Sequence, residues 1–238
     1  MRIALSTRLG LAGHSGALPT GVWAVGLALL ALLAWDASGL DLWVMRHVGT
    51  GAGFAWRDSW FTTQVIHQGG RMLSWVVIAF IVLANLRPAR VLPRLTSRER
   101  LGWLLTTLLC LAVVSLVKRV SLTSCPWDLA EFGGTAAYVS HWAFGLSDGG
   151  GGHCFPSGHA SAAFAFLGGG WVLRRAYPRL ASAWLMCVIS LGLVYGVGQM
   201  LRGAHYPSHT LWTAWICWAA TVATAQLGER RVSRLAAA

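Results

Sequence analysis

Six long apolar stretches constrain the fold of this chain more than any other feature of its sequence. They lie near residues 21–36, 72–86, 101–117, 160–173, 180–201 and 210–226. Several are shorter than the roughly 18 to 20 residues that a bilayer span needs, so we expect the helices to extend into flanking Gly, Ser and Trp residues. With 55% hydrophobic and only 11% charged residues, the composition is also that of a membrane protein. The sequence therefore predicts an all-α, polytopic membrane bundle of about six transmembrane helices.

The first apolar stretch has two interpretations. Arg2 and Arg8 precede it, as basic residues precede the apolar segment of a cleaved signal peptide. The lead-in is long and weakly basic, however, and Asp36 stands near any cleavage site. We therefore expect this stretch to be retained as a membrane span.

The basic residues predict the orientation of the bundle. In a six-helix arrangement, thirteen of the 19 Lys and Arg residues fall on one side, which we expect to be cytoplasmic together with both termini. They are Arg2, Arg8 and the arginines of segments 87–100, 174–179 and 230–234. The long, poorly basic connections 37–71 and 118–159 then face outward, into the periplasm if the membrane is a bacterial inner membrane.

Most of the net charge of +11 is explained by this topology. No basic stripe and no aromatic stacking platform accompanies the charge, so we expect no nucleic-acid binding. Neither a repeat nor a linker divides the chain, and we interpret residues 1–238 as a single domain.

Three predicted helix ends bring polar residues to the outward side. Lys118 and Arg119 end the third apolar stretch, FPSGH (155–159) precedes the fourth, and LRGAHYPSH (201–209) joins the fifth to the sixth. Ionisable groups at the membrane boundary are costly and commonly mark a site. Backbone N–H groups of a Ser-Gly-His turn at a helix start suit an anion, above all phosphate.

These residues resemble the motifs of the type 2 phosphatidic acid phosphatase family, which are Lys-x6-Arg-Pro, Pro-Ser-Gly-His and Ser-Arg-x5-His-x3-Asp. The resemblance covers residues 118–209 and implies a six-helix fold. The second motif is complete at residues 156–159. The first matches from Lys118 to Pro126, with Cys125 in place of Arg.

The third motif departs from the family at two positions. His205 stands where the family has its nucleophile, but Gln199 replaces the Arg and His209 replaces the Asp. Arg202 lies about one helical turn from the vacant Arg position. The segments CPWD, CFPSGH and RGAHYPSH resemble those of a bacterial subgroup of the family.

The resemblance implies a phosphohistidine mechanism. His205 would attack phosphorus, and His159 would donate a proton to the leaving oxygen. The phosphate-binding set that it implies is Lys118, Arg119, Ser157, Gly158 and Arg202. His209 can accept a hydrogen bond from His205, as the family Asp does, but supplies no negative charge. We therefore predict slower phosphohistidine formation than in relatives with the carboxylate.

Two cysteines belong to the outward connection. In an oxidising compartment Cys125 and Cys154 could form a disulfide, and otherwise they are two free thiols. The sequence leaves both states open.

A metal site is a further alternative. Imidazole and thiolate are ligands of zinc, and the candidates are His153, Cys154, His159, His205 and His209. Neighbouring Lys and Arg residues repel a cation and favour an anion. We therefore expect neither a metal nor another cofactor.

Some polar residues have a simpler interpretation. We interpret His14, His47 and His141 as interfacial side chains. The segment HQGGR (67–71) precedes the second helix on the outward side. It is either a segment that recognises a lipid headgroup through Arg71 or a loop with an interfacial arginine.

The sequence thus predicts a metal-independent membrane lipid phosphatase. Its substrate would be a phosphate monoester or pyrophosphate of a membrane lipid, such as lipid A, undecaprenyl pyrophosphate, phosphatidyl glycerophosphate or phosphatidic acid. Two alternatives stay open: a lipid-to-lipid phosphotransferase, and a catalytically silent protein that binds an anionic lipid. The sequence indicates no oligomeric state.

Overall fold

The structure is a computed structural model that describes residues 17–237, and these residues form helices and loops without a β-strand. Arg2, Arg8 and His14 lie outside the described residues. The helices are α1 (Ala17–Ala37), α2 (Leu40–Val48), a π-helix (Phe61–Gly69), α3 (Gly70–Leu86), α4 (Ser97–Val120), two short 3-10 helices (Pro126–Asp128 and Ala130–Phe132), α5 (Ser161–Phe164), α6 (Gly168–Leu173), α7 (Pro178–Leu201) and α8 (Pro207–Ala237). The prediction of an all-α fold is confirmed.

Several helices are long and apolar enough to cross a membrane. Within the described residues these are Phe61–Leu86, Ser97–Val120 and Pro178–Leu201, and a fourth if the pair Gly21–Ala37 and Leu40–Val48, bent by 64°, counts as one span. The structure therefore gives three or four candidate spans by length and composition, whereas the sequence predicted six. The helix over one predicted span, 160–173, is interrupted after Phe164. This span is therefore divided between α5 and α6.

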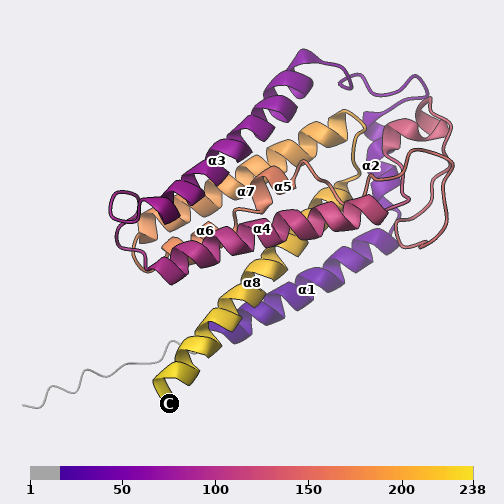
Figure 1. Ribbon diagram of the computed structural model, residues 1–238. Helices are drawn as coiled ribbons and strands as arrows, with labels where there is room; N and C mark the ends of the chain where they lie inside the picture. Colours follow the sequence, from indigo (N-terminus) through magenta and orange to yellow (C-terminus); the bar gives the residue numbers. More distant parts are fainter. Residues whose placement is uncertain (1–16, 238) are drawn as a thin grey trace, which may run out of the picture.

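The helices pack around the short helix α5. Figure 1 shows α3 beside α4 and α1 beside α8, and α5 contacts α3, α4, α7 and α8. Helix α4 begins at a capping box, in which the Thr96 hydroxyl accepts from the Glu99 N–H at 3.2 Å and the Glu99 carboxylate accepts from the Thr96 N–H at 2.8 Å. This cap fixes where α4 starts, and α4 in turn carries Lys118 near its other end.

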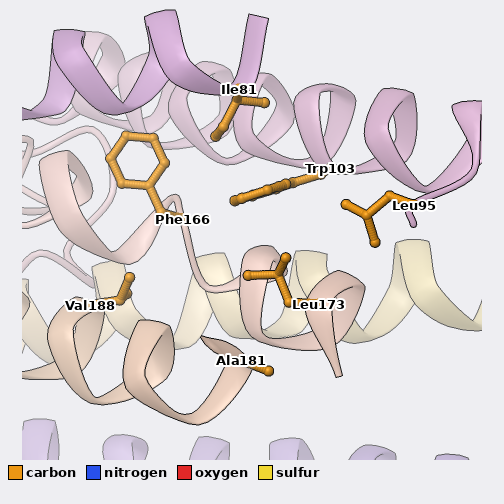
Figure 2. Close-up of a cluster of buried hydrophobic side chains, with 7 residues drawn as sticks. All are labelled: Ile81, Leu95, Trp103, Phe166, Leu173, Ala181 and Val188. Atoms are coloured by element: carbon orange, nitrogen blue, oxygen red, sulfur yellow. The ribbon is translucent and has the colours of Figure 1, made fainter. Parts of the chain in front are cut away.

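An apolar core holds the end of the bundle that lies near the connection between α3 and α4. Figure 2 shows Trp103 of α4 at its centre, between residues of α3, α6 and α7. The buried members are Ile81, Leu95, Trp103, Phe166, Leu173, Ala181 and Val188. Close packing of this kind makes the helices a rigid frame for the residues at their opposite ends.

The segment between α2 and α3 differs from its prediction. HQGGR was expected to precede the second helix, but it lies inside one continuous helix, because Phe61–Gly69 is a π-helix that runs directly into α3. Gly69 and Gly70 both keep helical backbone angles. The wider π-helical turn carries His67 and Ile66, and such turns occur frequently at functional sites.

Candidate active site

The complete Pro-Ser-Gly-His motif lies at the start of the α5 region, packed against α8. Ser157 is fully buried, and its N–H donates to the His209 carbonyl at 3.1 Å. The Ser157 N–H is therefore not free to bind an anion, contrary to the expectation from the sequence. The N–H groups of Gly158 and His159 make no hydrogen bond to other described residues, so these two groups can receive one.

Lys118 passes directly over this turn. A Cβ at Gly158 would lie 3.3 Å from Cδ of Lys118, so a glycine leaves room for the lysine stem. Arg119 is exposed and forms no hydrogen bond or ion pair with the described residues. Since adjacent helical residues point about 100° apart, the structure brings Lys118 into the site but leaves Arg119 outside it.

Two residues of the π-helix position the His159 ring. Its Nε2–H donates to the Ile66 carbonyl at 3.2 Å, and its ring stacks on His67 with centroids 4.6 Å apart. Burial lowers the pKa of His159 to about 4, and the neighbouring His67 acts in the same direction. In the ligand-free protein His159 is therefore neutral at neutral pH, and its Nδ1 carries the free lone pair.

His205 follows a tight turn after α7. Gly203 has a φ of +73°, and a Cβ there would lie 2.3 Å from Phe54, so the turn requires glycine. The buried His205 ring places Nδ1 3.4 Å from Nδ1 of His209. Burial lowers the pKa of His205 well below its usual value, and the charge of Lys118 and the ring of His159 add to this effect.

His209 lies behind His205, in the first turn of α8. A hydrogen bond between the two Nδ1 atoms requires the proton on one of them. If His205 carries it, Nε2 of His205 has the lone pair of a nucleophile, and His209 must carry its own proton on Nε2. That Nε2 atom is buried and has no partner among the described residues.

Arg202 and Gln199 of the third motif lie at the end of α7. Arg202 donates through Nε to the Arg57 carbonyl at 2.9 Å, and its guanidinium lies over the Trp127 ring at 5.8 Å. Gln199 stands at the family's Arg position; it is buried, and its Nε2 has no partner among the described residues. Both side chains therefore keep donors that a ligand could use.

The two cysteines of the outward connection are joined in a disulfide between Cys125 and Cys154. Its sulfur atoms carry no proton, so Cys154 offers no thiolate to a metal. The ligand atoms of Cys154, His205 and His209 lie within 4.8 Å of one another, but with the disulfide formed only the two imidazoles remain as good ligands. This donor set fits a metal site poorly.

A buried carboxylate accepts hydrogen bonds from the glycine run (149–152) that precedes the second motif and from the segment before Cys125. Asp148 accepts from the Ser124 N–H at 2.6 Å and the Ser124 hydroxyl at 2.7 Å, and also from the Gly150 N–H at 3.0 Å. The connection is thus tied to the segment that carries Cys125.

Three side chains near the motifs were missed or misread in the sequence. His141 was expected at the interface, but its side chain is only 7% exposed and contacts Asp36. Asp41 binds Ser208 beside His209 through the Ser208 N–H at 2.9 Å. These contacts join residues more than 100 positions apart, and the only signal in the sequence was the rarity of acidic residues within an apolar segment.

The fold and this cluster define a helical membrane protein in which two histidines, a lysine and an arginine gather where three helices end. The model of the PAP2 superfamily matches residues 100–233. No curated protein and no solved structure matched significantly. The family match spans more than half of the chain, which therefore belongs to the PAP2 superfamily and has a phosphatase-type fold. The family predicted from the sequence is confirmed.

Proposed function

We propose that this chain is an integral membrane lipid phosphatase that works through a phosphohistidine at His205. The observation that carries the proposal is the contact between the Nδ1 atoms of His205 and His209 at 3.4 Å. It orients the nucleophile in the same way as the carboxylate of a catalytic triad, through the nitrogen that does not attack. Burial keeps His205 neutral, as a nucleophile must be.

The reaction proceeds in two displacements. The lone pair on Nε2 of His205 forms the N–P bond, while the P–O bond to the lipid breaks and the leaving oxygen takes a proton from His159. Water then attacks the phosphohistidine, His159 takes up a proton of that water, and phosphate leaves with His205 restored. General acid help of this kind is worth about 100- to 10,000-fold.

The phosphate oxygens need cations and N–H donors. Lys118 and Arg202 supply positive charge, and the free N–H groups of Gly158 and His159 supply donors. The unpaired Nε2 of Gln199 replaces part of what the family Arg provides. Since phosphoryl transfer depends mainly on positioning and charge stabilisation, these groups serve as much as the histidines.

The proposed substrate is a phosphate monoester or pyrophosphate of a membrane lipid. Lipid A, undecaprenyl pyrophosphate, phosphatidyl glycerophosphate and phosphatidic acid all present such a group at headgroup depth. We place the site at the periplasmic face of a bacterial inner membrane, with both termini cytoplasmic. The disulfide between Cys125 and Cys154 supports an oxidising compartment.

A single-turnover experiment tests the proposal. Purified protein is mixed with phosphatidic acid labelled with ³²P, quenched in base, and examined for label on histidine. We expect label on the wild-type chain and on His47→Ala, whose histidine is exposed on α2, and none on His205→Ala. Vanadate, which mimics five-coordinate phosphorus, should block labelling, and a chelator should not. Label on His205→Ala would contradict the proposed nucleophile.

A silent lipid-binding protein is the second candidate. It is favoured by Gln199 and His209, which replace two residues of the third motif. Such a protein would bind vesicles that contain phosphatidic acid but would release no phosphate from any of the lipids named above. A panel of these lipids therefore separates the candidates, and an added lipid acceptor distinguishes hydrolysis from phosphoryl transfer.

A further inference from the structure

A buried carboxylate from the other end of the chain lies beside the start of α8. Oδ2 of Asp36 accepts from Nε1 of Trp212 at 2.8 Å, from Nε1 of Trp142 at 2.9 Å and from Nε2 of His141 at 3.2 Å. The Asp36 side chain is only 4% exposed, and its Oδ1 has no partner among the described residues. Because an ionised carboxylate is costly to bury, its presence here needs a reason.

His141 connects this carboxylate with the site. Its Nε2–H donates to Asp36, which leaves the lone pair on its Nδ1. Its ring stacks on Phe155 with centroids 4.1 Å apart and lies edge-on to His209 at 5.8 Å. Burial lowers the pKa of His141, and the carboxylates of Asp36 and Asp41 act in the opposite direction.

The histidine pair has no carboxylate of its own. When Nε2 of His205 bonds to phosphorus, the His205–His209 pair gains a positive charge. The proton between the two Nδ1 atoms is then shared by both rings. The His209 side chain then carries protons on both nitrogens, and its Nε2–H needs an acceptor. In the third motif of the family an Asp at this position supplies the charge. Here position 209 cannot do so.

We propose that Asp36, acting through His141, supplies the negative charge that the histidine at position 209 lacks. This inference rests on the proposed function. The proton of His205 moves toward Nδ1 of His209, Nε2–H of His209 turns to Nδ1 of His141, and Nε2–H of His141 stays on Asp36. Asp36 is a positioning and charge-compensating residue that touches neither substrate nor phosphorus.

Asp41 is the natural comparison, because it is also buried near α8. Its carboxylate is already used: it accepts from the Ser208 N–H at 2.9 Å and from Nε1 of Trp35 at 2.9 Å, and it also accepts from the Ser208 hydroxyl. These bonds fasten the first turn of α8. We therefore expect Asp41 to be structural, and Asp41→Asn is the matched control.

A double-mutant cycle tests the inference. The single-turnover rate of phosphohistidine formation is measured for wild type, Asp36→Asn, His209→Asp and the combination of the two. We expect Asp36→Asn to lower the rate about 10- to 100-fold with KM unchanged, a smaller loss than removal of a triad carboxylate in direct contact. In the His209→Asp background the loss should shrink to less than about twofold, because a carboxylate then contacts His205 directly.

The Asp41→Asn control distinguishes a chemical role of Asp36 from a structural one. Asp41→Asn should lower the rate by the same factor in both backgrounds. An Asp36→Asn loss that is equally large in both backgrounds would overturn the inference. If His209→Asp does not fold, His141→Gln takes its place: we expect His141→Gln and Asp36→Asn to cost the same, and the double variant no more. Failure of the wild-type chain to be labelled would reject the proposed function instead.

Discussion

The imidazole of His67 lies flat against that of His159, with centroids 4.6 Å apart and ring planes inclined by 18°. His67 belongs to the π-helix, whereas His159 ends the Pro-Ser-Gly-His motif. Two stacked imidazoles repel each other when both are protonated. The proposed general acid is therefore held in a setting that favours its neutral form until an anion arrives.

The pH dependence of the reaction should reflect this setting. The proposed mechanism needs His159 protonated, and the pKa of His159 in the free protein is about 4. The protonated fraction falls as pH rises above that value, so kcat/KM should decline from an optimum on the acid side of neutrality. A bound phosphate dianion raises the pKa of His159, so kcat should decline at higher pH than kcat/KM. Both profiles are measured in detergent, and coincident declines would contradict this account.

Removing the charge of His67 should move the profile. In His67→Phe a ring still stacks on His159, but the positive charge is gone, so the pKa of His159 should rise. We expect the decline of kcat/KM to shift to higher pH by up to about one unit. His47→Phe, a change on an exposed part of α2, should leave the profile where it is. A shift to lower pH in His67→Phe would be the opposite of the expected result.

Gln199 should affect the binding of the substrate phosphate rather than the protonation of His159. Gln199→Glu keeps the shape but replaces the unpaired Nε2 donor with a carboxylate oxygen. Repulsion of the phosphate should raise KM about tenfold or more, since a hydrogen bond to a charged group is worth roughly 1.5 to 3 kcal/mol. Gln64→Glu, on the exposed side of the π-helix, is the control. Steady-state kinetics with equal KM for both variants would reject a role for Gln199.

The disulfide should stabilise the fold around the site. Cys125 and Cys154 are 29 residues apart in sequence, and a loop of that length gives about 3 to 4 kcal/mol in the chain-entropy model. The double change to alanine should lower Tm, measured by intrinsic fluorescence in detergent. Cys187→Ala, which removes an exposed free thiol, should leave Tm unchanged. An equal Tm for all three proteins would show that the disulfide adds no stability.

The sequence predicted the helical class and the family because both depend on local signals. Apolar stretches gave the helices, and fixed spacings gave Lys118, His159 and His205. The continuous helix over residues 61–86 was missed, because Gly69 and Gly70 resemble a loop and a π-helix has no periodicity that the sequence reveals.

Contacts between distant segments could not be predicted from residue types alone. Asp36 and His141 are 105 positions apart in sequence, and the packing of α1 along α8 also brings Asp36 to Trp212. Arg119 was expected in the site as a replacement for the missing arginine of the first motif, but the turn of the helix points it elsewhere. The bond from the Ser157 N–H to His209 depends on how α5 and α8 cross, which no single segment determines.

The acceptor that holds His159 is the main-chain oxygen of Ile66, at 3.2 Å. Every amino acid carries that oxygen, so exchanging the side chain at position 66 cannot delete it. The side chain at this position has a separate task, because its methyl groups pack against Gly198 of α7. A replacement at position 66 would therefore disturb packing while leaving the acceptor in place, whereas the deletion of a residue upstream would rotate the helix and carry that oxygen away from His159.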